Sequence, residues 1–238
     1  MSGHSKWSTI KHKKAIQDNK RGKLFTKLGK AIMVAAREGG DDLSSNFKLR
    51  LAVDKGKQFN MPKDNIDRAI KKGSGGVGGE VFSEIVYEGF GPGKLAILVE
   101  VLTDNKNRSV SEVKRVFDKS GGSLGQSGSV GFLFAKKGRI VVLKKGEADE
   151  QMLKLIDLGA EDVEKIGEGV EVLVASEKLF EIKKKIETTG FTVKEAELFY
   201  LPLNPMKLDE KAEEKVLGFL DSMDDLEDVQ NVYSNLLL

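Results

Sequence analysis

The sequence predicts an α+β multidomain protein in which an N-terminal three-helix domain is followed by two α+β domains, the last ferredoxin-like and inserted in the middle one. Apolar residues recur with a helical period before residue 73, and runs rich in β-branched residues alternate with helical segments after residue 80. A helix and a strand at the C-terminus have no neighbour in the sequence to pack on. We therefore expect domains at 1–79, at 80–135 plus 206–238, and at 138–201.

The first two helices follow from apolar spacing and capping residues. Apolar side chains recur every three or four positions over about 15–37, which is typical of a helix with one buried stripe, and Gly39 and Gly40 are expected to end it. A second helix is predicted over about 47–59, after the capping candidates Ser45 and Asn46.

A third helix is predicted from Pro62, which suits a first helical turn, to a stop at Gly73. The glycine-rich run GSGGVGG at 73–79 then indicates a flexible linker. A phosphate loop is the weaker interpretation, because GxGxxG loops follow a strand and open a helix, and no GxxxxGK[ST] sequence occurs.

The segment 80–135 is predicted to fold as ββαβ. Two strands, SEIVYEGF and KLAILVEVLT, are predicted to be joined by the turn GPG. A helix is predicted at SVSEVKRVFDKS, and a returning strand at SVGFLFA. The glycine-rich SGGSLGQSGS at 120–129 is expected to be a surface loop whose glycines permit positive φ and a close approach to a nucleic-acid backbone.

The remaining elements predict the insertion. Six segments indicate the order βαββαβ, which is the ferredoxin-like split unit. They are RIVVLK, EQMLKLIDL, DVEKI, VEVLVA, EKLFEIKKKIET and FTVKEAELFYL. The tail then supplies an acidic helix and the strand DVQNVYSNL. Since a lone helix and strand cannot bury their own apolar faces, we expect them to complete the unit begun at 80–135.

Composition narrows the class of function. The chain has no Cys and only two His, which excludes disulfides and thiolate zinc sites and makes a His-based catalytic triad improbable. No apolar run is long enough to span a membrane, and the N-terminus has no stretch resembling a signal peptide. We expect a soluble, cytoplasmic, non-enzymatic protein with no cofactor, no metal and no small-molecule substrate.

Charge is strongly asymmetric although the whole chain nets only +2. Residues 1–79 carry 18 Lys and Arg against 7 Asp and Glu, whereas the rest carries 21 basic and 30 acidic side chains. A basic module on an acidic body is typical of a protein that binds a polyanion. The alternative is that the lysines only keep the surface soluble.

The basic residues supply the candidate nucleic-acid contacts. On the first helix, Lys20, Lys23, Lys27 and Lys30 fall within a sector of about 80° and are expected to project together into solvent. The loop 103–109 is adequately explained as a set of helix caps, and its basic residues are contacts if it meets an anion instead. Trp7 either packs on the helices or stacks on a base. The full candidate set is Lys6, Lys11, Lys13, Lys14, Lys20, Lys23, Lys27, Lys30, Lys71, Lys72, Lys106 and Arg108.

Long segments of the chain resemble the YebC family, which includes the mitochondrial translational activator of cytochrome oxidase subunit I. They are GHSKWSTIKHKKAIQDNKRGKLFTKL, NMPKDNIDRAIKKG, YEGFGPGKLAILVEVLTDNKNRSVSEVKRVFDKSGGSLGQSGSVGFLF and LPLNPMKLDEKAEEKVLGFLDSMDDLEDVQNVYSN. The resemblance implies three domains with the last inserted in the middle one, and no enzymatic activity or cofactor. It also implies either a DNA-binding regulator of transcription or a ribosome-associated factor that helps translation through proline runs.

Two functions therefore stay open, with an enzyme as a weak third. Either the basic residues of 1–79 bind duplex DNA, as in a transcriptional regulator, or they bind ribosomal RNA, as in a ribosome-associated factor. Phosphate attraction supplies most of the non-specific affinity for either polymer. The first thirty residues contain eight Lys and one Arg, which favours contact with the phosphate backbone over readout of bases and slightly favours the ribosome.

Overall fold

The structure is a computed structural model that describes residues 18–75 and 81–237, with side chains from Arg21 onward. It forms two compact units, one from the described residues up to Phe134 together with those from Pro202, the other from Ala135–Leu201. Several sequence-based expectations concern residues outside the described part: the contacts Lys6, Lys11, Lys13 and Lys14, the side chain of Lys20, the position of Trp7, and residues 76–80 of the linker.

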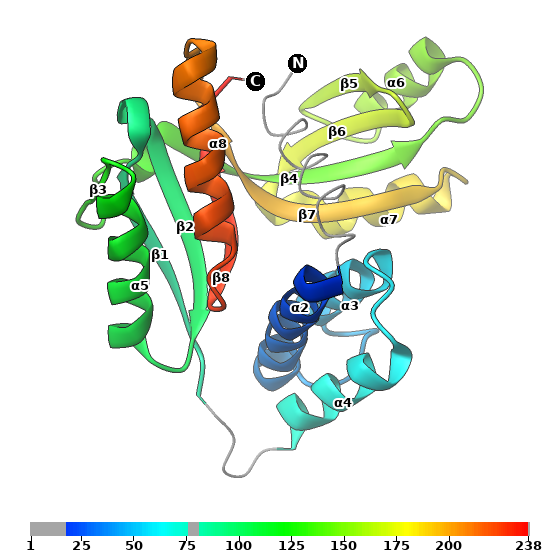
Figure 1. The fold of residues 1–238 in the computed structure, drawn as a ribbon. Coiled ribbons are helices and arrows are strands. Elements are labelled where there is room, and N and C mark those ends of the chain that lie inside the picture. The colour runs from blue at the N-terminus through cyan, green and yellow to red at the C-terminus, as the bar shows by residue number, and fades with distance from the viewer. Residues whose placement is uncertain (1–17, 76–80, 238) are drawn as a thin grey trace. The chain divides into compact units, whose positions relative to one another are not determined.

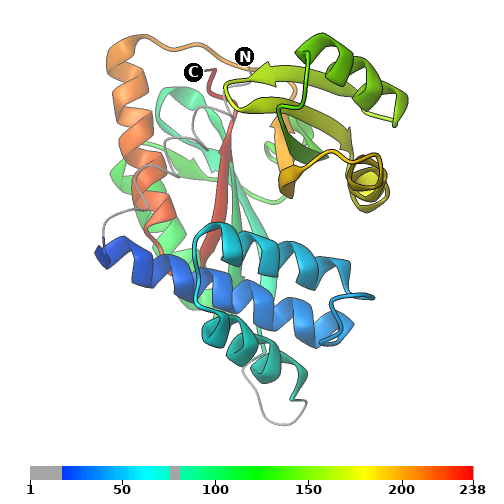
Figure 2. The ribbon, with the colours of Figure 1, turned by 90° about the vertical axis from the view of Figure 1, so that its right-hand side faces the viewer.

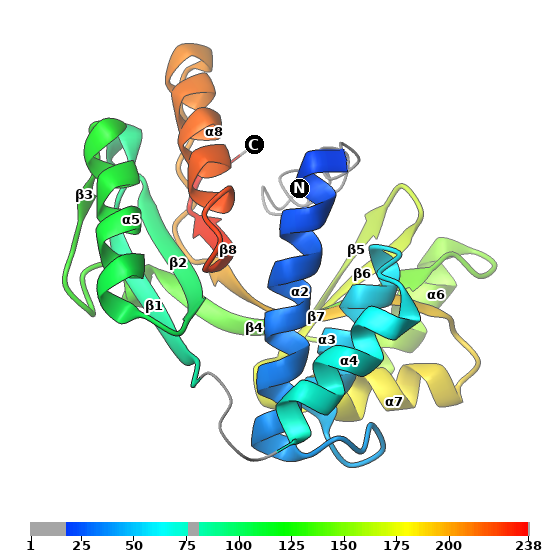
Figure 3. The same cartoon turned by 60° about the horizontal axis from the view of Figure 1, so that its bottom comes forward.

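The described part of the chain begins with three helices, as the sequence predicts: α2 (Asp18–Gly39), α3 (Phe47–Gln58) and α4 (Lys63–Ser74) (Figure 1). Figure 3 shows α2 with both shorter helices beside it. Their apolar faces meet in a small core that includes Leu28, Ile32, Leu49, Val53 and Ile66. Burial of this shared core holds helices that would each be marginal in isolation.

The connection between α2 and α3 is fixed by Asn46, one of the two predicted caps. Its side-chain oxygen accepts a hydrogen bond from the Leu49 N–H at 2.9 Å. Its amide nitrogen donates to the carbonyl oxygens of Ala35 and Gly40, each at 2.7 Å. α2 ends at Gly39, and Gly40 has φ of +82°, which is the left-handed geometry expected where a glycine ends a helix.

Gly73 does not end the third helix, contrary to expectation, because α4 continues to Ser74. It is buried against α2 instead. A Cβ at this position would overlap the carbonyl oxygen of Met33 and lie 2.9 Å from the Cβ of Ala36. The glycine is therefore needed for the close approach of α4 to α2 and not for a turn.

A four-stranded antiparallel sheet follows, with strand order β3-β1-β2-β8. Its strands are β1 (Ser83–Phe90), β2 (Ala96–Thr103), β3 (Ser123–Leu124) and β8 (Val229–Ser234). β2 and β8 run side by side in Figure 2, where β8 is red. The C-terminal strand thus completes a sheet begun early in the chain, as predicted.

Two helices, α5 (Lys106–Lys119) and α8 (Glu210–Asp224), cover one face of this sheet. Their apolar residues pack on the alternating positions Ile97, Val99 and Val101 of β2. The ring centroids of Phe117 and Phe219 lie 5.2 Å apart, so the two helices also contact each other over the sheet.

The predicted strand SVGFLFA is wrong in most of its length. Gly131–Leu133 is a short 3-10 helix, and Phe134 already begins β4 (Phe134–Leu143) of the second sheet. The edge strand comes instead from the preceding glycine-rich segment, where Ser123 pairs with Phe90 of β1. In that segment Gly121 and Gly128 have positive φ, as expected.

The second sheet has the order β5-β6-β4-β7, with β5 (Asp162–Ile166), β6 (Gly169–Ala175) and β7 (Val193–Pro202). The helices α6 (Ala148–Asp157) and α7 (Leu179–Thr188) interrupt its strands in sequence. Numbered within the unit, the strand order is 2-3-1-4, and the chain order is βαββαβ. The predicted ferredoxin-like fold is confirmed.

Candidate nucleic-acid interface

Three candidate lysines form a row along α2, at positions 23, 27 and 30, which we call the lysine face. The spacing of four and three residues places them on one side of the helix. Lys23 is exposed, but Lys27 is buried and the side chain of Lys30 is only 13 % exposed. The expectation that all of them project into solvent is therefore wrong for Lys27 and Lys30.

The lysine face meets Asp224–Asp228, the last residue of α8 and the four residues that lead to β8, which we call the acidic turn. Lys23 Nζ donates to the carbonyl oxygen of Asp225 at 3.4 Å, and Lys27 Nζ donates to that of Asp224. Lys27 Nζ also lies 3.9 Å from the Asp224 carboxylate. Each of these lysines thus has an oxygen of the acidic turn within reach.

Lys30 pairs with two carboxylates of the acidic turn. Its ammonium lies 3.0 Å from the carboxylate of Glu227 and 2.9 Å from that of Asp228. Burial alone lowers the pKa of Lys30, but the hydrogen bonds and charges of Asp228 and Glu227 outweigh that effect and raise it. Lys30 is therefore held in its charged form.

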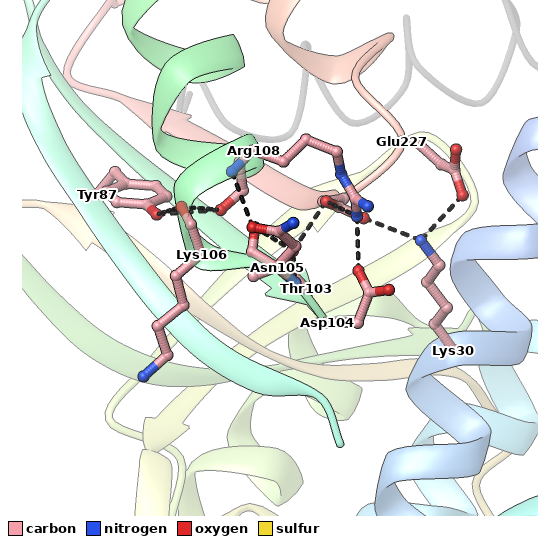
Figure 4. A network of polar contacts seen from close by, with 10 residues as sticks. Lys30, Tyr87, Thr103, Asp104, Asn105, Lys106, Arg108 and Glu227 are labelled. Carbon is pink, nitrogen blue, oxygen red and sulfur yellow. Dashed lines mark hydrogen bonds and ion pairs between the residues drawn. The ribbon is translucent and has the colours of Figure 1, made fainter. Parts of the chain in front are cut away.

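Asp228 accepts hydrogen bonds from three segments of the chain, α2, β2 and the start of α5, whose donors Lys30, Thr103 and Arg108 are labelled in Figure 4. Its carboxylate accepts from Lys30 at 2.9 Å, from Arg108 at 2.7 Å and from the Thr103 hydroxyl at 2.9 Å. Burial alone raises the pKa of this carboxyl, but the three donors outweigh it and the pKa is lowered. A carboxylate that is 2 % exposed thus stays ionised because it is fully surrounded by donors.

The loop 103–109 behaves mainly as a helix start. Asn105 caps α5 by accepting from the Arg108 N–H at 3.1 Å, which confirms the capping interpretation for this residue. The Arg108 guanidinium is shared between Asp104 and Asp228, both at 2.7 Å. Lys106 is exposed, and its side chain points away from the network in Figure 4. Of the two candidates in this loop, only Lys106 presents its charge outward.

Lys71 and Lys72 lie in the last turn of α4 and are exposed. A cation at the C-terminal end of a helix interacts favourably with the partial negative charge of the terminal carbonyls, so these lysines also have a structural reason to be where they are.

The glycine-rich loop is held by an internal carboxylate. Glu88 of β1 accepts hydrogen bonds from the backbone N–H groups of Gly128, Val130 and Gly131, at 2.8, 2.8 and 2.6 Å. Burial raises the pKa of Glu88, and the three N–H donors lower it by more. These backbone donors therefore bind a carboxylate of the chain itself.

Sequence reasoning missed the pairing of the lysine face with the acidic turn. The signal available was the opposite charge of the two segments, since DDLED is the densest acidic run of the tail. Charge alone does not say which acid meets which lysine across almost two hundred residues. The pairing depends on where β8 joins the sheet, because this strand brings Asp228 beside Thr103 at the end of β2.

Within the described part of the chain, no helix is long and apolar enough to cross a membrane.

Comparison with known proteins assigns the family. Residues 5–76 match the model of the TACO1/YebC protein N-terminal domain, and residues 82–236 match that of the TACO1/YebC second and third domain. A "Probable transcriptional regulatory protein" of Geotalea uraniireducens is 51 % identical over 235 residues, which cover 99 % of this chain and 95 % of the relative. One of the same description from Thermotoga maritima is 47 % identical over 237 residues, which cover 99 % and 93 %.

A solved structure agrees with this assignment. The crystal structure of a conserved hypothetical protein from Aquifex aeolicus is similar with a TM-score of 0.83 and 43 % sequence identity, over 92 % of this chain and 91 % of that one. The two curated relatives are named as regulatory proteins and not as enzymes. The chain belongs to the TACO1/YebC family.

Proposed function

We propose that the protein is a non-enzymatic regulator of gene expression that binds the phosphate backbone of a nucleic acid through its N-terminal helical region. The observation that carries the proposal is the separation of charge, with 18 basic and 7 acidic residues in 1–79 against an acidic remainder. A patch of this kind attracts any polyanion, and phosphate contacts alone supply most of non-specific binding. The regulatory names of the curated relatives support the same class of function.

The candidate contacts are not equivalent in the structure. Lys71, Lys72 and Lys106 are exposed, so we assign them to the interface. Lys27 and Lys30 already bind the acidic turn, so they contribute only if that contact opens. The contacts expected from Lys6, Lys11, Lys13, Lys14 and Lys20 stay part of the proposal on the sequence alone.

A salt titration tests this proposal. Replacing Lys71 and Lys72 with Gln removes up to two phosphate contacts, so the slope of log K against log salt for duplex DNA should become less negative by up to about 1.8. The matched control is K211Q/K215Q, which removes two exposed lysines from the acidic helix α8 and should leave the slope unchanged. Absence of binding to duplex DNA, RNA and ribosomes at low salt would overturn the proposal.

We further propose that structured RNA of the ribosome is the preferred target. Lysine is a point charge that binds phosphate without reading bases, and the first thirty residues hold eight Lys and one Arg. A protein of this kind gains little discrimination among duplex sequences, whereas folded RNA offers shape. This supports the translational alternative over the transcriptional one that the relatives' names indicate.

Two measurements at the same salt concentration separate these targets. The first is co-sedimentation with ribosomes in a gradient at about physiological ionic strength, which should retain the protein. The second is competition between random and promoter duplexes, which should show little preference. A strong preference for one promoter with no ribosome association would replace the ribosomal proposal by the transcriptional one.

A further inference from the structure

We infer that the acidic turn Asp224–Asp228 is an internal competitor for phosphate, which occupies the lysine face of α2 until a nucleic acid displaces it. This inference rests on the proposed function, because it concerns the control of lysines proposed to bind a nucleic acid. It adds a closed state, in which acidic turn and lysine face are joined, and an open state, in which the lysines are available. The closed state is the one in the structure.

The contacts match in number and chemistry. Each lysine of the face has at least one oxygen of the turn as partner. Lys23 contacts a backbone carbonyl, and Lys27 contacts a backbone carbonyl and a carboxylate. Lys30 contacts two carboxylates. Carboxylate and phosphate oxygens are both anionic acceptors for an ammonium group. The turn therefore offers the lysine face what a nucleic-acid backbone would offer, and the two cannot use the same ammonium groups fully at once.

The network around Asp228 allows Lys30 to leave at limited cost. When one partner of a buried ion pair is removed, the main penalty comes from a charge left without compensation. Asp228 would keep its bonds from Arg108 and Thr103, both at or below 2.9 Å, so its carboxylate would stay satisfied. The other carboxylate at Lys30 belongs to Glu227, whose side chain is 67 % exposed and can return to water.

The opposing ligand must be extended to compete. A single phosphate replaces one contact, while the rest of the turn keeps its place on α2. A nucleic-acid strand with several phosphates can bind all the lysines of the face at once. Its apparent affinity is then lowered only because a fraction of the molecules is in the open state. The acidic turn thus favours long polyanions over free phosphate and nucleotides.

The central experiment compares two variants of the full chain with the same change of net charge. D224N/D225N/E227Q neutralises three acids of the turn and leaves Asp228 in place. The control E210Q/E213Q/E214Q neutralises three acids in the first turns of the same helix α8, at the end opposite to the acidic turn. The probes are a single-stranded RNA and a duplex DNA of about 24 nucleotides or base pairs, at low salt.

We expect the turn variant to bind both probes about ten-fold more tightly than the control, since the ion pairs of Asp224 with Lys27 and of Glu227 with Lys30 oppose binding in the wild type. Equal affinities of two folded variants would overturn the inference and leave the proposed function standing. Failure of the wild type and both variants to bind any probe would instead overturn the proposed function, and the inference with it. Far-UV circular dichroism and melting curves establish that each variant is folded.

A second measurement needs no substitution. A carbodiimide joins an amine to a carboxylate in direct contact, so the wild type should give a Lys30–Glu227 cross-link, identified by mass spectrometry, because these groups lie 3.0 Å apart. Saturating RNA should lower its yield several-fold, whereas the same concentration of inorganic phosphate should not. A yield unchanged by RNA that is shown to be bound would contradict the inference.

Discussion

Lys30 Nζ lies 2.9 Å from Oδ1 of Asp228, although the two residues are 198 positions apart in the sequence. The same carboxylate accepts from Thr103, at the end of β2, and from Arg108 of α5. One buried acid therefore joins the first described helix, the second strand and the segment that leads into the last strand. Its removal should affect more than a single ion pair.

We expect Asp228→Asn to lower the free energy of unfolding by about 3 kcal/mol, because it leaves Lys30 and Arg108 around an uncharged group. Asp104→Asn is the matched control, since Asp104 also pairs with Arg108 at 2.7 Å but its side chain is 39 % exposed. That change should cost no more than about 1 kcal/mol. Urea unfolding at pH 7 measures both, and equal losses would contradict the central role of Asp228.

The lowered pKa of Asp228 predicts the direction of a pH effect. Its folded pKa lies below the ordinary value of 3.8, so the unfolded chain takes up its proton first as the pH falls. The stabilisation is fully present above pH 3.8 and is lost as the pH falls through the folded pKa. The difference in urea midpoint between wild type and D228N should therefore shrink in acid, and a difference that grows below pH 4 would contradict the assignment.

Glu88 gives a prediction about the glycine-rich loop. Glu88→Gln replaces a charged acceptor of three backbone N–H groups by a neutral one that also carries unwanted donors. We expect a loss of about 2 kcal/mol and faster amide hydrogen exchange at Gly128, Val130 and Gly131. Glu84→Gln, on the same strand but exposed, should leave those amides unchanged. Unchanged exchange in E88Q would show that the loop holds its shape without the carboxylate.

Gly73 and Gly218 form a natural pair for testing helix packing. Gly73→Ala places a methyl group against the Met33 carbonyl, so we expect a loss of about 2–3 kcal/mol. Gly218 lies in α8 with nothing within 4 Å of an added Cβ, so Gly218→Ala should stabilise the protein by about 0.5–1 kcal/mol. Thermal melts of the two variants should shift in opposite directions, and a shift of G73A to higher temperature would contradict the close approach of α4 to α2.

The ferredoxin-like unit is expected to fold by itself. Its described core contains Ile140, Leu155, Val172 and Ile182, all buried. A protein consisting of residues 138–201 should therefore show cooperative unfolding by far-UV circular dichroism. A chain that ends at Ala135 should fold poorly, since it lacks β8, which pairs with the central strand β2. The reverse result would contradict the insertion.

Most of the fold could be predicted from the sequence because local patterns of residues determine its helices and strands. The apolar period of α2, the cap at Asn46 and the βαββαβ order each follow from neighbouring residues. The predictions at Gly73 and at SVGFLFA were wrong, and the structure shows the reason for Gly73. A glycine near a helix end has the same appearance whether it stops the helix or fits against another one, and only the packing of α2 on α4 distinguishes them.

The candidate interface was less accessible from the sequence. Helical spacing placed Lys23, Lys27 and Lys30 on one face correctly, but it could not show that the acidic turn covers that face. Long-range ion pairs follow from the joining of distant strands, in this case β2 and β8. Exposure is therefore the property of a charged residue that sequence periodicity predicts least well.

The late arrival of β8 has a consequence during synthesis. β2 is flanked by β1, which is made just before it, and by β8, which is made only after the whole ferredoxin-like unit. Until then the nascent chain carries β2 with one unpaired edge, and seven of its eight residues are buried in the finished protein. Such an edge is a template for pairing with other chains. Translation that pauses within the inserted unit therefore holds the protein in its most aggregation-prone form, and chaperone binding should be strongest over that interval.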